Sequence, residues 1–173
     1  MKKFELTSEF VTFLGKKLFR IKALVEFGNV KAGELGGYIE KEENLSQSGN
    51  AWVYGNAEVY GNAEVYGDAE VYGNARVCGN ARVYGNAEVC GDAEVCGDAD
   101  YAYARGFGSC FRTTTFFRLK DGGIGVRCGC FYGTLQEFRD KVRETHKNTK
   151  KAREYLMLAN LMELRFSKEG MEE

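Results

Sequence analysis

The sequence predicts a mainly β protein, in which a short parallel β-helix follows an N-terminal β-hairpin cap and precedes a C-terminal ββαα unit. Nine consecutive hexads, spanning residues 49–102, repeat G-[ND]-A-x-[VY]-[YCA] without an insertion. A repeat this short cannot bury its own apolar face, so each copy must stack on its neighbours. Periodicities in the flanking sequence define the other two parts. We therefore expect a cap over residues 1–48, the β-helix over 49–104 and the ββαα unit over 105–173.

The hexad indicates how each coil is built. Its Ala and Val lie two residues apart and share one strand face, whereas the residue between them and the Tyr after Val face outward. Gly with Asn or Asp recurs at every corner, and these residues tolerate left-handed backbone angles. Three such sides give a coil of 18 residues. Residue i should therefore stack on residue i+18 at roughly 4.8 Å.

Stacking at this interval aligns the side chains of successive coils. The expected inner columns are Val53–Val71–Val89, Val59–Val77–Val95 and Val65–Val83–Tyr101. The expected outer columns are Glu58–Arg76–Glu94, Glu64–Arg82–Asp100 and Trp52–Glu70–Glu88. The first two alternate in sign, which favours cross-strand attraction, whereas the third places Glu70 beside Glu88. Outward aromatic ladders contain Tyr54, Tyr60, Tyr66, Tyr72 and Tyr84.

The pattern resembles the left-handed hexapeptide-repeat β-helix family over residues 49–102, with an aliphatic residue, a small residue two places before it and Asn or Gly near the corner. The resemblance implies a left-handed coil and a trimer, with a dimer as the alternative. The family is best known for acyltransferases with a catalytic His in or beside a coil, and it includes carbonic anhydrases with three zinc-binding His. Here the coils contain no His and the chain has one, His146. This argues against an acyltransferase and excludes that zinc site.

Upstream of the hexads, two alternating apolar segments predict a β-hairpin. Phe10–Leu14 and Lys17–Ala23 flank Gly15 and Lys16, a typical hairpin turn. A Gly-punctuated stretch then leads through Tyr38 and Ile39 into the first coil. Because an uncovered strand edge invites aggregation, we expect residues 1–48 to cover the first rung.

Downstream, the sequence predicts a second hairpin followed by two helices. Thr113–Leu119 and Ile124–Phe131 surround a Lys-Asp-Gly-Gly turn. Thr134 and Glu137 have the spacing of a capping box, which predicts a helix to about Glu144. The second helix is predicted by apolar residues at helical spacing, namely Ala152, Tyr155, Leu156, Ala159, Met162 and Phe166.

The whole chain also resembles a group of phage and prophage proteins with a hexapeptide-repeat middle. The segments that carry this resemblance are Gly36–Glu40, Asn44–Ser46, Thr113–Phe117, Lys120–Gly122, Cys128–Phe131 and Glu144–His146. The resemblance implies an accessory phage protein that interferes with a host defence or regulatory factor.

Composition and charge narrow the setting. No run approaches the length of a membrane span, and the first residues lack the features of a signal peptide, so we expect a cytoplasmic protein with reduced cysteines. Cys78 and Cys96, one coil apart, are accordingly expected to be free thiols. Residues 49–102 carry two basic and nine acidic side chains, whereas residues 103–173 carry 14 and nine. This asymmetry argues against nucleic-acid binding by the whole protein.

Cysteines in the C-terminal part raise the question of a metal. Cys128 and Cys130, one residue apart on a predicted strand, would face the same side, and Cys110 or His146 could join them around zinc. A C-x-C pair without a second pair is a weak signal, so core packing is the favoured interpretation. The acidic corners do not indicate calcium, because calcium-binding β-rolls repeat every nine residues. We expect neither a metal nor any other cofactor.

Two binding functions remain open, and both are non-enzymatic. In the first, an oligomer uses its Tyr ladders together with Glu70 and Glu88 to bind a host protein. In the second, the protein sequesters a small nucleotide-like or phosphorylated ligand. The candidate phosphate contacts are Arg112, Thr113, Arg118 and Arg127. A solvated strand surface is the simpler interpretation of these four residues.

Overall fold

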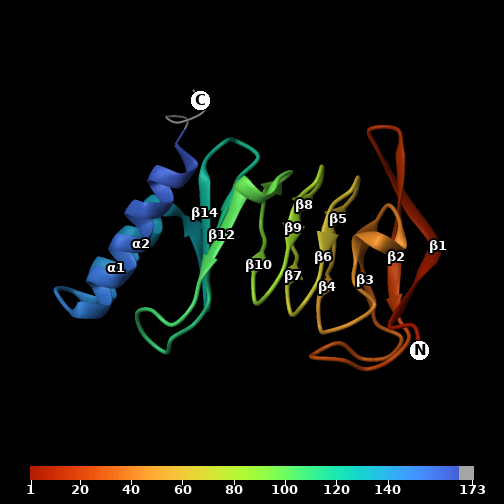
Figure 1. Cartoon of the computed structure of the whole chain (residues 1–173), viewed down its shortest axis with the longest axis horizontal. Coiled ribbons are helices and arrows are strands. Elements are labelled where there is room, and N and C mark those ends of the chain that lie inside the picture. The colour runs from red at the N-terminus through yellow and green to blue at the C-terminus, as the bar shows by residue number, and fades with distance from the viewer. Residues whose placement is uncertain (168–173) are drawn as a thin grey trace. The chain divides into compact units, whose positions relative to one another are not determined.

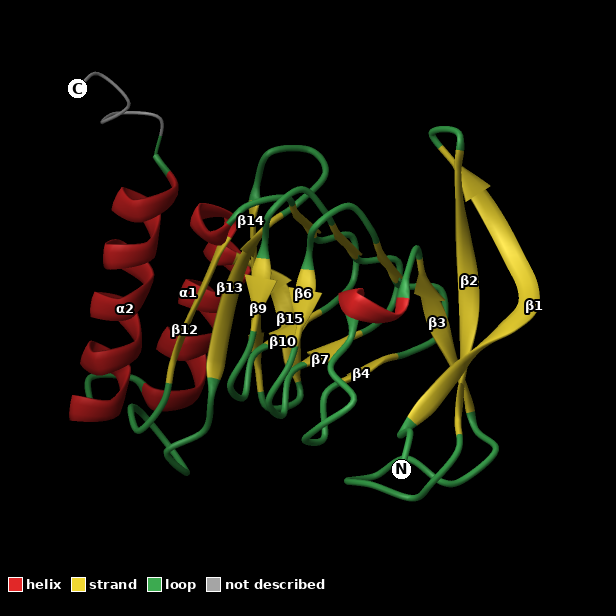
Figure 2. Ribbon diagram, turned by 45° about the vertical axis from the view of Figure 1, so that its right-hand side comes forward, coloured by secondary structure: helices red, strands yellow, loops and turns green. Residues whose placement is uncertain are grey.

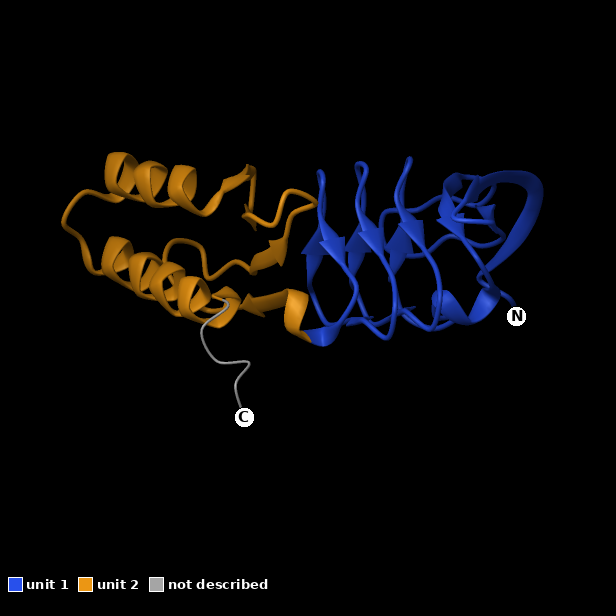
Figure 3. Cartoon of the chain, turned by 90° about the horizontal axis from the view of Figure 1, so that it is seen from above, with its two compact units in different colours: residues 1–98 blue, residues 99–173 orange. Residues whose placement is uncertain are grey.

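The computed structural model describes residues 1–167 and confirms the mainly β fold. The chain forms two compact units, Met1–Asp98 and Ala99–Glu173 (Figure 3). The first contains a β-hairpin and a parallel β-solenoid of about three coils, and the second contains an antiparallel sheet and two helices (Figures 1 and 2).

Each side of a solenoid coil carries one two-residue strand. These strands are β4 (Trp52–Val53), β5 (Glu58–Val59), β6 (Glu64–Val65), β7 (Glu70–Val71), β8 (Arg76–Val77), β9 (Arg82–Val83), β10 (Glu88–Val89) and β11 (Glu94–Val95). They pair in parallel as three ladders, β4–β7–β10, β5–β8–β11 and β6–β9. In every pair the residues that face each other are 18 apart, as the hexads predict.

The corner glycines hold this spacing. From Gly49 to Gly91, all eight have a positive φ of 58° to 74°, a region that side chains other than glycine rarely enter. Successive corners also lie against each other, because a Cβ built on Gly73 would lie 2.8 Å from the backbone nitrogen of Gly91. A side chain at these positions would therefore be strained and would force the coils apart.

The solenoid core consists of the predicted Ala and Val columns, whose side chains are almost completely buried. The third predicted column is wrong at its last member. Tyr101 lies on β12 (Tyr101–Ala104), which pairs antiparallel with a later strand. The ninth hexad enters a 3₁₀ turn, η2 (Asp98–Asp100), and Asp98 accepts hydrogen bonds from the Arg82 side chain. The outer column that was expected to continue to Asp100 is therefore completed by Asp98.

The predicted hairpin is confirmed and continues one face of the solenoid. β1 (Phe4–Phe13) and β2 (Lys16–Ala23) are antiparallel, and β2 pairs with β3 (Leu35–Ile39). β3 in turn pairs in parallel with β5, giving the six-stranded order β1-β2-β3-β5-β8-β11. The edge of the first regular coil is therefore covered on this face.

An irregular coil precedes the hexads. Ile39 faces Val59, and Leu45 bridges to Val65, so each of these pairs is 20 residues apart rather than 18. The 3₁₀ turn η1 (Glu42–Asn44) lies between Ile39 and Leu45. Buried Asn44 donates to the carbonyl oxygens of Gly61 and Ala63 at 3.2 and 2.8 Å. Its amide thus satisfies backbone acceptors that a regular strand would otherwise pair.

A second part of the cap covers the outward Trp52. Its ring is fully buried between Phe4 and Phe27, with ring centroids at 6.1 and 5.3 Å. Lys3 is also buried, and its ammonium donates to the carbonyl oxygen of Ala51 at 2.9 Å. Burial lowers the pKa of Lys3 to about 8.

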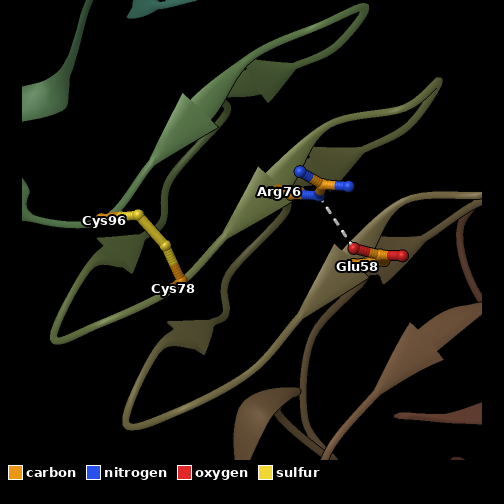
Figure 4. The surroundings of a disulfide bond; sticks show 4 residues. All are labelled: Glu58, Arg76, Cys78 and Cys96. Atoms are coloured by element: carbon orange, nitrogen blue, oxygen red, sulfur yellow. Dashed lines mark hydrogen bonds and ion pairs between the residues drawn. A yellow bond between two sulfur atoms is a disulfide. The ribbon is translucent and has the colours of Figure 1, made fainter. Parts of the chain in front are cut away.

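Cys78 and Cys96 form a disulfide between adjacent coils (Figure 4). The expectation of free thiols was therefore wrong. Stacking at 18 residues places their Cα atoms 4.3 Å apart. Cys78 is also buried beneath Leu18 of the hairpin rather than exposed on an outer column. On the same face, Arg76 and Glu58 form the predicted cross-coil ion pair at 3.0 Å (Figure 4).

The second unit contains four strands rather than the two predicted. β12, β13 (Thr114–Arg118), β14 (Ile124–Cys128) and β15 (Phe131–Thr134) form an antiparallel sheet in that order. β12 was missed because its sequence continues the hexad pattern, and β15 was missed because it is short. The predicted hairpin, β13–β14, forms the centre of the sheet.

Both predicted helices are confirmed. α1 (Leu135–His146) begins at the capping box, in which Thr134 accepts from the Glu137 amide and Glu137 accepts from the Thr134 amide. α2 (Lys150–Phe166) begins at Thr149, whose side chain accepts from the Ala152 amide. Their apolar faces pack with the sheet around Phe116, Val126, Phe138, Tyr155, Ala159, Met162 and Phe166. No helix within residues 1–167 combines the length and apolarity needed to span a bilayer.

The first prediction concerns the solenoid core. Val77 is completely buried between Val59 and Val95, so Val77→Asp places an unpaired charge there and should lower the free energy of unfolding by about 4 kcal/mol or more. Glu64→Gln, on the exposed side of a strand, is the control and should change it by less than about 0.5 kcal/mol. Chemical denaturation measures both, and a cooperative Val77→Asp protein of wild-type stability would contradict the inward assignment.

The second prediction concerns Lys3. Its folded pKa of about 8 lies below its ordinary value of 10.5, so between these values the folded chain binds fewer protons than the unfolded chain. The Lys3 contribution to stability should therefore rise with pH over this range. From pH 7 to 10, the unfolding free energy of wild type relative to Lys3→Met should increase by about 1–3 kcal/mol. Urea denaturation tests this, with Lys2→Met as an exposed control. Parallel pH profiles for wild type and Lys3→Met would show that Lys3 is not responsible.

Candidate functional site

The second unit contains a cavity of about 220 Å³ between its sheet and its helices. The residues that line it come from four segments: the loop before β13, the β14–β15 turn, α1 and α2. They are Ser109, Arg112, Cys128, Cys130, Phe131, Phe138, Lys141, Val142, Thr145, His146 and Tyr155. The cavity therefore brings together Arg112, Cys128, Cys130 and His146 from the candidates that the sequence suggested.

The loop before β13 is fixed to α2 by two contacts. The amide of Gly108 donates to Glu154 at 2.7 Å, and the amide of Ser109 donates to the Tyr155 hydroxyl at 3.1 Å. Gly108 lies directly against the Tyr155 ring, so a Cβ there would overlap the ring. Its φ of 69° also favours glycine. This glycine lets the loop approach closely enough for Ser109 to form one wall of the cavity.

The two cysteines are not placed as the sequence predicted. Cys128 ends β14, whereas Cys130 lies in the two-residue turn before β15, after Gly129 with its φ of 58°. The pair therefore does not share one face of a strand. The Cys128 sulfur accepts a hydrogen bond from the Thr114 hydroxyl at 3.1 Å, while Cys130 is exposed at the cavity.

The apolar floor is aromatic. Phe138 lies edge-on to Tyr155 at 5.7 Å between centroids, and the His146 ring lies 5.7 Å from Tyr155 on another side. Phe131 completes the group at 5.5 Å from Phe138. Burial raises the pKa of the Tyr155 hydroxyl, so this group remains neutral and donates to the Ser109 carbonyl oxygen at 3.3 Å.

Two permanent cations border this floor. Arg112 extends along the turn, close to Gly129, and no carboxylate in the described chain pairs with its guanidinium. Lys141 on α1 donates to Glu144 at 2.8 Å, and this hydrogen bond raises its pKa. No Asp or Glu lines the cavity. The arrangement is therefore electropositive and suited to an anion.

The metal alternative finds no support in this geometry. Within residues 1–167, no group of three or more His, Cys, Asp and Glu side chains is placed to hold a metal ion. Cys128, Cys130 and His146 line the same cavity but do not assemble as a ligand set.

The four-residue phosphate cradle is not assembled either. Arg118, at the far end of β13, lies over the Phe166 ring at 5.0 Å and donates to the Phe166 carbonyl oxygen at 2.9 Å, so it caps the C-terminus of α2. Thr113 and Arg127 do not line the cavity. Arg112 is therefore the member of this group that remains a candidate.

The solenoid ladders present less aromatic surface than predicted. Tyr60 is buried beneath the hairpin, with its ring 5.5 Å from that of Phe13, and is not available to a partner. This column was predicted to face solvent because the sequence gives no sign that β1 and β2 fold over it.

Two further tyrosines are engaged by the acidic column. The Tyr54 hydroxyl donates to Glu70 at 3.5 Å and the Tyr72 hydroxyl donates to Glu88 at 3.1 Å. Burial, followed by the Glu70 charge, raises the pKa of Tyr54 to about 12. These contacts explain how Glu70 and Glu88 lie side by side without an adjacent cation.

Tyr66 and Tyr84 are the predicted ladder residues that stack face to face. Their centroids are 5.3 Å apart and their planes are inclined by 11°. Tyr84 is 43% exposed. This pair is the remaining candidate for an aromatic contact on the solenoid.

Sequence reasoning missed Lys141, Ser109, Tyr155 and Phe138 as site residues. A signal existed on α1, where Phe138, Lys141, Val142 and Thr145 recur at helical spacing and give one face both apolar and cationic character. Ser109 had no comparable signal, because its position depends on how the loop docks on α2. The chain matches no known protein-family model, and no curated protein shows significant similarity to it.

The third prediction tests the loop contact. Gly108→Ala should lower the free energy of unfolding by about 2 kcal/mol more than Gly106→Ala. Both glycines have a positive φ, but a Cβ at Gly106 meets no atom within 4 Å, so the control carries the backbone strain without the overlap. Chemical denaturation measures the difference. Equal losses in the two variants would show that the Tyr155 contact does not fix the loop.

Proposed function

We propose that the protein is a non-enzymatic binding protein that holds a small phosphorylated ligand in the cavity of its second unit. The observation that carries the proposal is the unpaired guanidinium of Arg112 beside Lys141 at the border of an aromatic floor. Concave apolar sites with a few convergent polar groups are the usual form of small-molecule sites. Arginine is also suited to phosphate, since its planar donors bind two oxygens at once.

The size of the cavity limits the ligand. About 220 Å³ corresponds to roughly seven water molecules at about 30 Å³ each. This volume admits a phosphate with part of an attached ring, as in a nucleoside monophosphate, and does not enclose a larger nucleotide. The phosphate would lie at Arg112 and Lys141, with the ring toward Phe138 and Tyr155.

The biological role that we propose follows from the resemblance to phage and prophage proteins. Sequestering a small phosphorylated molecule would interfere with a host defence or regulatory factor that depends on it. Direct binding of a host protein is the second candidate, and the exposed Tyr66–Tyr84 stack favours it, since paired aromatic rings are common at protein interfaces.

The fourth prediction tests the ligand site by isothermal titration calorimetry. Nucleoside monophosphates should bind the full chain more tightly than the matching nucleosides or inorganic phosphate, because only they fill both parts of the cavity. Arg112→Ala should weaken this binding about 10- to 100-fold, corresponding to the loss of one charge-assisted hydrogen bond or pair. Arg143→Ala is the matched control, because Arg143 is exposed on α1, pairs with Asp140 and does not line the cavity.

Two results would contradict this function. One is no binding of any monophosphate, together with no phosphorylated compound in native mass spectra of freshly purified protein. The other is equal weakening by Arg112→Ala and Arg143→Ala, which would indicate general electrostatics rather than a site. Recovery of a host protein whose capture is lost in Tyr66→Ser/Tyr84→Ser would instead support the second candidate.

A further inference from the structure

Helix α2 is apolar on two opposite faces. One face, which includes Ala152, Tyr155 and Ala159, is buried against the sheet and α1. On the other face, Met157, Leu161 and Leu164 are 70%, 55% and 66% exposed. They follow one another at i, i+4 and i+7, so they form one continuous stripe. A helix that is apolar on both faces is normally covered on both.

We propose that this stripe pairs with the same stripe of a second copy of the chain, with the two α2 helices antiparallel. The stripe is self-complementary about Leu161. In a twofold arrangement Leu161 would meet Leu161 of the second copy, and Met157 would meet Leu164. Such an isologous contact closes as a dimer and leaves no open surface.

Charge determines the orientation of the pair. The sequence around the start of α2 carries four basic side chains, Lys147, Lys150, Lys151 and Arg153, and one acidic side chain, Glu154. From Glu163 to the last residue, the sequence carries four acidic side chains, Glu163, Glu169, Glu172 and Glu173, and two basic ones, Arg165 and Lys168. Antiparallel pairing brings the basic end of one copy near the acidic end of the other. Parallel pairing would place like charges together.

The stripe is distinct from the small-molecule site. Tyr155 faces the cavity and the core, whereas Met157, Leu161 and Leu164 neither line the cavity nor belong to the buried cluster. The inference therefore does not depend on the proposed ligand, and the two can fail separately.

The fifth prediction is tested by size-exclusion chromatography with multi-angle light scattering on the full chain. Wild type should be a dimer at micromolar concentration, and non-reducing gels should show that it is not cross-linked through Cys110 or Cys130. Leu161→Glu places two carboxylates at the twofold axis and should raise the dimer dissociation constant by about 100-fold. Leu14→Glu is the matched control, because Leu14 is 80% exposed at the tip of the hairpin, and this variant should remain dimeric.

Charge reversal tests the orientation. Lys150→Glu/Lys151→Glu should weaken the dimer, Glu172→Lys/Glu173→Lys should also weaken it, and the fourfold variant should restore it. Circular dichroism and urea denaturation of each variant establish that it is folded. Failure of the fourfold variant to recover would overturn the antiparallel arrangement. A wild-type monomer, or an oligomer lost in Tyr66→Ser/Tyr84→Ser and retained in Leu161→Glu, would overturn the α2 interface altogether.

Discussion

The first unit depends on one constraint, the interval of 18 residues between stacked side chains. Each solenoid strand is two residues long and finds its hydrogen-bond partners only in the coils before and after it. A single insertion would turn inward Val residues outward, because side chains alternate between the two faces of a strand. The corner glycines enforce the interval, since their positive φ and mutual contact leave no space for a side chain. The disulfide between Cys78 and Cys96 and the Arg76–Glu58 ion pair both use the same interval.

A stacked coil always has an open end, and the cap shows how that end is satisfied. The first coil is irregular, with residue pairs 20 apart, and Asn44 supplies side-chain donors where regular strand pairing stops. Lys3 supplies a further donor to the Ala51 carbonyl oxygen. Placing an ammonium in this buried position is unfavourable for its charge, as its lowered pKa shows. Satisfying the backbone acceptors at the end of the solenoid outweighs that cost.

The second unit is organised differently, and this difference concerns function. The solenoid fills its interior with Ala and Val and leaves no interior space for a ligand. The second unit instead packs two helices on a sheet with large aromatic side chains, and a loop anchored by Gly108 leaves a cavity beside them. Cationic groups at that cavity lack an acidic lining residue, so an incoming anion meets no like charge. The proposed ligand site and the exposed face of α2 therefore both belong to the basic part of the chain.

The sequence by itself determined the elements whose physical cause is local or periodic. These include the hexad coils and their inner columns, the hairpin turn, and the Thr134 cap of α1, where short-range sterics or hydrogen bonds suffice. Tertiary structure alone decided which outward residues become buried, as with Tyr60 and Trp52, because the covering segments lie far away in the chain. It likewise separated Arg118 from Arg112 and brought Ser109 to Tyr155. A repeat encodes its own stacking, whereas a binding cavity depends on how unlike segments pack, which no single segment encodes.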